Sequence, residues 1–254
     1  MENMQWLAAY FSPTGTTKKV ALAIAEGSGA AVQEIDLCSP AIPDIIAEEV
    51  VLLAAVPVYG GRVPAVALER LSRLQGKGRV AVAVAVYGNR EFDDALLELK
   101  SALEHCGFQV AAAGAFIAEH SIVRSIAADR PDERDLEIAR QFGANIVKKL
   151  AVPGDIAAIQ VPGNFPYKQF KGMPAQPQAG CACAKCGICA KACPVGAIPP
   201  ENPQLTDKDR CITCMRCVAI CPHQARTLPA PVVAASTAML KVKAGGHKEP
   251  QIFL

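Results

Sequence analysis

Two runs of four cysteines recur in the last third of the chain. Each run has the form Cys-x2-Cys-x2-Cys-x3-Cys-Pro, and every matched position recurs 28 residues later. The runs use eight of the 11 cysteines: Cys183, Cys186, Cys189, Cys193, Cys211, Cys214, Cys217 and Cys221. Two residues between successive cysteines let a tight loop present three thiolates to one small cluster. The pattern therefore predicts two [4Fe-4S] clusters.

Zinc and disulfides are the alternatives for these cysteines. Paired Cys-x2-Cys elements also build zinc sites, but zinc would leave half of the thiols unused. Disulfides are disfavoured because the chain shows no secretory leader, which predicts a cytoplasmic protein with reduced thiols. Cys38 and Cys106 are expected in the core. Cys181 competes with Cys183 as first ligand, and only Cys183 gives the two-residue spacing to Cys186.

A second candidate site is the segment 12–17, Ser-Pro-Thr-Gly-Thr-Thr, between an expected strand and an expected helix. The hydroxyls of Ser12, Thr14, Thr16 and Thr17 can donate to phosphate, as can amides beside Gly15 at the helix N-terminus. The segment matches neither the dinucleotide fingerprint nor the P-loop. By itself it is equally well a helix cap, but its position after the first strand favours phosphate binding.

Strand and helix signals alternate along the first 150 residues. We expect strands at 6–11, 32–37, 50–59, 79–87 and 109–118, and helices at 16–25, 63–74, 92–106 and 131–150. This βα order predicts a doubly wound α/β fold, with a five-stranded parallel sheet in the order 2-1-3-4-5. Its ligand crevice would lie at the carboxyl ends of strands one and three, where the segment 12–17 falls.

With these features, the chain resembles the family in which a flavodoxin is fused to a bacterial two-cluster ferredoxin, found in anaerobic microbes. The segment 12–17 is similar to the flavodoxin phosphate loop, and the cysteine runs are similar to those of bacterial ferredoxins. The resemblance covers roughly residues 5–228. We expect a flavodoxin-like FMN-binding domain at 1–150, a Pro- and Gly-rich linker at 151–180, a small α+β ferredoxin domain at 181–228 and a C-terminal tail at 229–254.

The resemblance also implies roles for individual residues. One cluster would be held by Cys183, Cys186, Cys189 and Cys221, and the other by Cys211, Cys214, Cys217 and Cys193. The isoalloxazine ring of FMN would be lined by Tyr59, Gly60, Gly61, Arg62, Val63, Tyr87, Gly88 and Asn89. Glycines admit close backbone approach and tyrosines can stack, although turn signals alone make both loops equally well ordinary turns. Arg62 near the flavin and His120 on the cofactor side are further candidates, and solvated side chains are the alternative for both.

Charge and hydropathy limit the other functions. The formal charge is +2, and two clusters with a flavin phosphate would change it to roughly −4, which gives no support for nucleic acid binding. No apolar run is long enough for a membrane span. The basic segment 241–248 is expected to be a solvated tail.

These features predict an intracellular, low-potential electron-transfer protein that passes electrons between two [4Fe-4S] clusters, FMN and partner redox enzymes. No residue has the setting of a nucleophile or general base, which favours a carrier over an enzyme. An FMN-dependent reductase of a small oxidant such as a quinone is the first alternative, and a redox sensor is the second. The oligomeric state stays open, with a dimer as one option.

Overall fold

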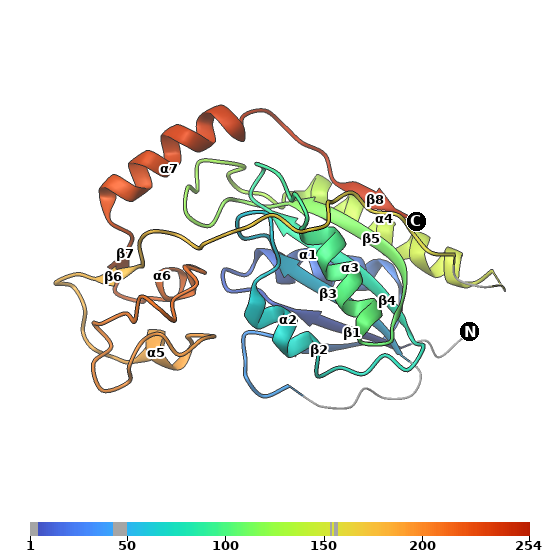
Figure 1. The fold of residues 1–254 in the computed structure, drawn as a ribbon, viewed down its shortest axis with the longest axis horizontal. Coiled ribbons are helices and arrows are strands. Elements are labelled where there is room, and N and C mark those ends of the chain that lie inside the picture. The colour runs from blue at the N-terminus through green and yellow to red at the C-terminus, as the bar shows by residue number, and fades with distance from the viewer. Residues whose placement is uncertain (1–4, 43–49, 153, 155–156) are drawn as a thin grey trace.

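The computed structural model describes residues 5–42, 50–152, 154 and 157–254, and its main body is a parallel sheet (Figure 1). The strands are β1 (Gln5–Tyr10), β2 (Val32–Asp36), β3 (Val50–Pro57), β4 (Val80–Tyr87) and β5 (Gln109–Ile117). They pair in the order β2-β1-β3-β4-β5, all parallel, which confirms the predicted fold. A short strand β8 (Gln251–Phe253), which was not predicted, pairs antiparallel with β5.

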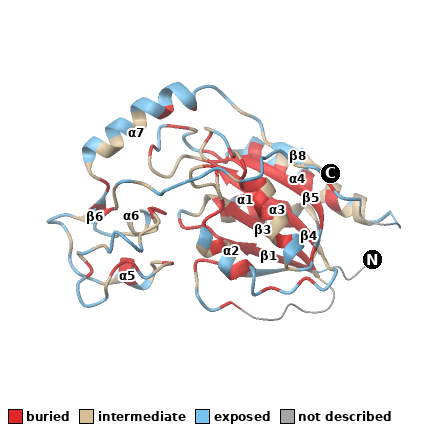
Figure 2. Cartoon of the chain, in the orientation of Figure 1, coloured by how far each residue is buried: buried red, intermediate tan, exposed pale blue. Residues whose placement is uncertain are grey.

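Helices cover both faces of the sheet. Alternate residues of β1 show this: Trp6 packs on the face of α1 (Thr16–Gly27) and α4 (Glu133–Leu150), whereas Leu7 faces α2 (Ala65–Leu71) and α3 (Ala95–His105). The edge strand β2 is partly exposed, whereas the strands β1, β3, β4 and β5 are almost entirely buried, as Figure 2 shows. Burial on both faces explains why they read as continuous apolar runs.

A small second unit carries the cysteine runs. It contains α5 (Ile188–Lys191), α6 (Arg216–Ala219) and the antiparallel pair β6 (Gln178–Ala179) and β7 (Arg226–Thr227). The 28-residue repeat extends to the backbone, because each of the following pairs shares a positive φ: Lys185 and Thr213, Gly187 and Met215, Gly196 and Gln224. Figure 1 shows this unit beside the edge at which the parallel strands end.

The C-terminal segment is a structured element. Helix α7 (Ala230–Lys243) follows the cysteine unit, and the chain then returns to the large sheet as β8 (Figure 1). The side chain of Asn89 donates to the carbonyls of Ala244 (2.7 Å) and Gly246 (2.9 Å). Lys248 donates to the carbonyl of Arg90 at 2.6 Å and pairs with Glu91. The basic segment 241–248 is mostly exposed, as expected of a solvated segment, but these distant partners, which local sequence does not reveal, anchor it to the α/β domain.

The linker lies along the α/β domain. The carboxylate of Asp94 accepts hydrogen bonds from the backbone N–H groups of Asn164 (2.8 Å) and Lys168 (2.6 Å). Phe165 remains exposed and stacks edge-on against Tyr167. Within the part of the chain that the structure describes, no helix has both the length and the hydropathy to cross a membrane.

Candidate cofactor sites

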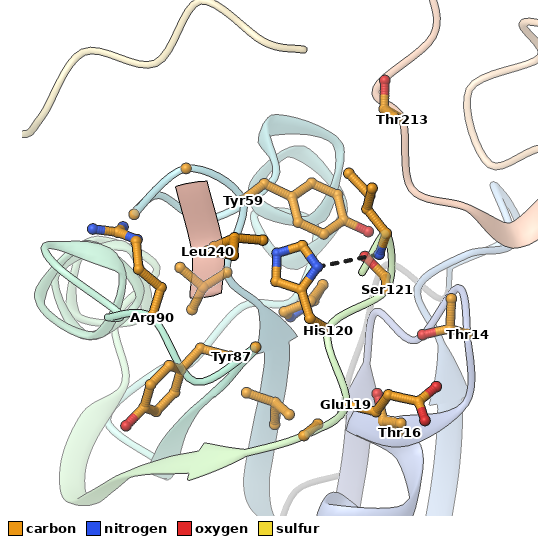
Figure 3. A pocket seen from close by; sticks show the side chains of 18 of the residues that line it. Thr14, Thr16, Tyr59, Tyr87, Arg90, Glu119, His120, Ser121, Thr213 and Leu240 are labelled. Carbon is orange, nitrogen blue, oxygen red and sulfur yellow. Dashed lines mark hydrogen bonds between the residues drawn. The ribbon is translucent and has the colours of Figure 1, made fainter. Parts of the chain in front are cut away.

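A cavity of about 240 Å³ opens at the carboxyl ends of the strands (Figure 3). Four loops of the α/β domain line it, together with the linker, the cysteine unit and α7. The predicted residues among the lining are Thr14, Thr16, Thr17, Tyr59, Gly60, Gly61, Tyr87 and Gly88. Ser12, Gly15, Arg62, Val63 and Asn89 do not line it. The sheet thus brings together most of the predicted site residues, from three separate loops.

The loop after β1 combines a helix cap with free donors. Gly15 has a φ of 96° at the N-cap of α1, and the Ser12 hydroxyl oxygen accepts the N–H of Lys18 at 2.9 Å. Ser12 therefore satisfies one amide of the first turn of α1, although the N-cap residue itself is Gly15. Thr14, Thr16 and Thr17 line the cavity, and the first amides of a helix have no intrahelical acceptor. This arrangement suits a bound anion.

Two glycines permit close packing at the other side of the cavity. Gly60 has a φ of 61°, and a Cβ there would lie 2.1 Å from the ring of Phe170. A Cβ on Gly88 would lie 2.6 Å from Cδ2 of His120. Larger residues would displace these two rings, which themselves line the cavity. The glycines are therefore required by packing and are more than ordinary turn residues.

The cation at this cavity is not the predicted one. Arg62 is bound by both carboxylate oxygens of Glu98, at 2.6 and 2.9 Å, and its guanidinium lies 5.0 Å from the Tyr167 ring. The hydrogen bond with Glu98 raises the pKa of Arg62. Arg90 lines the cavity instead and forms an ion pair with Asp93. The sequence did not reveal that Arg62 is paired outside the cavity lining, because its partner Glu98 lies 36 residues away, on α3.

His120 lines the cavity as a neutral donor. Its Nδ1 accepts the backbone N–H groups of Ile122 (3.2 Å) and Val123 (3.1 Å). Burial lowers the pKa of the imidazole. The ring is therefore neutral at neutral pH, with its proton on Nε2. The structure supports His120 as a residue of the site and not as a solvated side chain.

The eight motif cysteines surround two hollows. Cys183, Cys186, Cys189 and Cys221 line the first, and Cys193, Cys211, Cys214 and Cys217 line the second. Cys181 is exposed and lines neither. Two repeat-related bonds support the arrangement, because the N–H of Ala197 donates to Cys193 at 3.2 Å and that of Ala225 to Cys221 at 3.3 Å. The two donor sets are the crossed sets that the ferredoxin resemblance implies.

The other cysteines behave as packing residues. Cys38 is buried and Cys106 half-buried, in agreement with the expectation of core positions. Burial raises the pKa of the Cys38 thiol to about 12. Among residues 5–42, 50–152, 154 and 157–254, no three His, Cys, Asp or Glu side chains gather closely enough to hold a single metal ion.

The second hollow lies next to the cavity. Ile212 and Thr213, between two cysteines of that hollow, line the cavity (Figure 3). Burial raises the pKa of the Tyr59 hydroxyl, and the nearby thiols of Cys214 and Cys38 raise it further. The same side of the cysteine unit is tied to α2, since the buried Arg70 donates to the carbonyl of Pro194 at 2.5 Å.

Several cavity residues carried no signal in the sequence. Phe170 and Met173 come from the linker, Thr213 from the cysteine unit, and Met239 and Leu240 from α7. Helix α7 is mostly exposed, and Figure 2 shows little burial along it. Leu240 is its one buried residue. Only the tertiary arrangement of the linker, the cysteine unit and α7 against the α/β domain brings these positions together.

A family model described as a 4Fe-4S dicluster domain matches residues 182–226. No curated protein matches the chain. The chain thus joins a flavodoxin-like α/β domain, defined by its strand order, to a 4Fe-4S dicluster segment of the ferredoxin class.

Solved structures with similarity to the α/β part include a flavodoxin from the domain Archaea, with 16% identity, a TM-score of 0.40 and coverage of 58% of this chain and 99% of that one. Oxidised flavodoxin 1 from Bacillus cereus has 18% identity and a TM-score of 0.39, over 57% of this chain and 97% of that one. Rubredoxin oxygen:oxidoreductase from Desulfovibrio gigas has 16% identity and a TM-score of 0.40, over 60% of this chain and 38% of that one. Because these scores are low, the fold assignment rests on the strand order.

Proposed function

We propose that this protein is an electron-transfer protein that holds FMN in the cavity and one [4Fe-4S] cluster in each hollow. One loop carries the proposal: Cys211 and Cys214 line the second hollow, and the two residues between them line the cavity. Such a loop would put the two cofactors next to each other. Electron exchange between them and with partner redox proteins follows from that neighbourhood.

The cavity residues fit FMN. The hydroxyls of Thr14, Thr16 and Thr17 and the first amides of α1 would bind the phosphate. Tyr59 would contact the ring system, and Nε2 of His120 would donate to it. FMN supplies one- or two-electron chemistry, whereas each cluster passes one electron at a time. The chain's part is to hold the cofactors and exclude water.

The two clusters would stand in a fixed order. The cluster in the second hollow would lie nearer to FMN, because Ile212 and Thr213 separate that hollow from the cavity. The cluster of the first hollow would lie farther away, since none of its lining residues lines the cavity. The proposed path therefore leads from the first hollow through the second to FMN, or in reverse.

Side chains of α7 and the linker cover the cavity, which favours an electron carrier rather than a reductase of small molecules. Met239 and Leu240 of α7 and Phe170 and Met173 of the linker lie at the cavity wall, and Leu240 is 3% exposed. These apolar side chains restrict the space beside a bound ring. Two clusters also need eight thiolates kept from oxidation, so the proposal includes a cytoplasmic location.

Anaerobic reconstitution tests the proposal. We expect about eight irons and one FMN per chain, together with electron paramagnetic resonance signals of reduced clusters. Bound zinc, or a chain without flavin, would contradict it. Stopped-flow oxidation by redox proteins, without saturable turnover of quinones, would separate the carrier from the reductase.

A further inference from the structure

The 28-residue repeat of the cysteine unit is broken at a buried position. Ile198 in the first half is 3% exposed and packs against Cys189 and Ala190. Its repeat-related position is Arg226, which is 1% exposed. Burying a guanidinium where the repeat accepts an apolar side chain carries a large desolvation cost. The substitution therefore calls for an explanation in this unit.

The hydrogen bonds of Arg226 leave its charge unpaired. Nη1 donates to the carbonyl of Pro203 at 2.6 Å, and Nη2 donates to the carbonyl of Pro177 at 3.2 Å and to the hydroxyl of Thr206. These partners are neutral, and no carboxylate in the described part of the chain forms an ion pair with Arg226. Its Nε is buried without a hydrogen-bond partner. The net positive charge is therefore available to a negative group nearby.

That charge adjoins the first hollow. Arg226 lines the first hollow, and its Nη1 lies 3.7 Å from the sulfur of Cys189. The contact with Cys189 and the place of Arg226 in the lining put its charge beside a cluster bound in the first hollow.

We propose that Arg226 sets the reduction potential of the cluster in the first hollow and raises it above that of the cluster in the second. This inference rests on the proposed function. Reduction of a cluster adds one electron and no proton, so its negative charge grows by one. A nearby cation in a medium of low polarity stabilises that added charge, and N–H donation to a ligand sulfur acts in the same direction. Because arginine stays protonated, the effect persists at every ordinary pH.

This arrangement would give the two clusters different tasks. The first-hollow cluster, farther from the cavity, would hold an electron from a partner protein more readily than the second. In the second hollow the repeat-related residue Ile198 is apolar, and the cation that lines this hollow, Arg216, has a carboxylate partner in Asp36 at 3.8 Å. The asymmetry therefore arises because only the charge at the first hollow lacks such a partner among the described residues.

The test is a redox titration of the reconstituted protein, with dithionite and mediators, followed by electron paramagnetic resonance. Arg226→Met keeps an unbranched side chain without the charge. In this variant the equilibrium constant for reduction of the first-hollow cluster should fall at least tenfold, which lowers its reduction potential by about 59 mV for a one-electron couple. The other cluster should shift less. Ile198→Met is the matched control at the repeat-related position and should leave both potentials unchanged, and Arg226→Lys should retain most of the wild-type difference.

Iron content separates the possible outcomes. A wild-type chain without clusters would refute the proposed function, whereas fully loaded Arg226→Met with wild-type potentials would overturn the role of Arg226 alone. If Arg226→Met does not bind iron, the titration is made with Arg226→Gln, whose amide still donates to carbonyls. Wild-type potentials in the iron-loaded Arg226→Gln variant would then overturn the role of Arg226. Loss of iron from both neutral variants would assign Arg226 to folding and would also overturn the inference.

Discussion

Replacing Arg70 with methionine tests how the cysteine unit is held against the α/β domain. Arg70 lies on α2 and is 5% exposed. It donates to the carbonyl of Leu37 within its own domain (2.6 Å) and to the carbonyl of Pro194 in the cysteine unit (2.5 Å). Pro194 directly follows Cys193 of the second hollow. The side chain therefore joins the two units at the hollow that adjoins the cavity.

The magnitude follows from the number of bonds lost. A hydrogen bond from a charged donor contributes about 1.5–3 kcal/mol, and only the bond to Pro194 crosses between the units. Arg70→Met should therefore weaken docking by about 1.5–3 kcal/mol, roughly 10- to 150-fold in the docking equilibrium. The bond to Leu37 affects the α/β domain itself, and relief of guanidinium burial offsets part of its loss.

Hydrogen exchange measures this change. Backbone amides in residues 191–217 should exchange faster by about the same factor if they open through undocking. Arg73→Met is the matched control, because Arg73 lies one turn farther along the chain and its side chain is 41% exposed in a pair with Glu69. Similar exchange in the two variants would refute docking through Arg70.

Three further predictions concern the sites. Cys183→Ala should lower the iron content from about eight to about four per chain, whereas Cys181→Ala should leave it unchanged; the reverse result in iron analysis would make Cys181 the ligand. Thr17→Val should weaken FMN binding about tenfold in a fluorescence titration, while Ser12→Ala should cost about 1 kcal/mol of stability as a lost hydrogen bond to the first turn of α1 and leave the affinity unchanged. Burial lowers the pKa of His120, so the unfolded chain binds this proton first and the free energy of unfolding should fall as the pH drops below about 6.5. Denaturant unfolding of His120→Gln should lack that part of the slope, and equal slopes in the two proteins would contradict it.

Local signals predicted the parallel sheet well. The five expected strands pair in the expected order, because buried strands read as apolar runs and covering helices as periodic stripes. Element ends were less accurate. The strand expected to reach residue 59 ends at Pro57, and the helix expected at 63–74 covers Ala65–Leu71. Pro57 lacks the N–H that would continue the sheet pairing, and Pro64, at the N-cap of α2, precedes the helix.

The sequence by itself determined the features that depend on short spacing. Three cysteines two residues apart require a tight loop wherever it lies, and a hydroxyl-rich turn between a strand and a helix presents free amides whatever surrounds it. The cysteine spacing therefore predicted its chemistry before any fold was considered, whereas the turn at 12–17 also needed its position after the first strand. Pairing of the fourth cysteine depended on the family resemblance, and the two hollows have the same crossed sets.

Tertiary structure decided everything that depends on contacts between distant segments. It pairs Arg62 with Glu98, returns the C-terminal segment to the sheet at β5, and brings Thr213 and Leu240 to one cavity. The spacing of residues along a chain carries no information about such neighbours, because they are selected by packing and by the partners that buried polar groups require. The charge of Arg226 beside Cys189 belongs to this second kind of information.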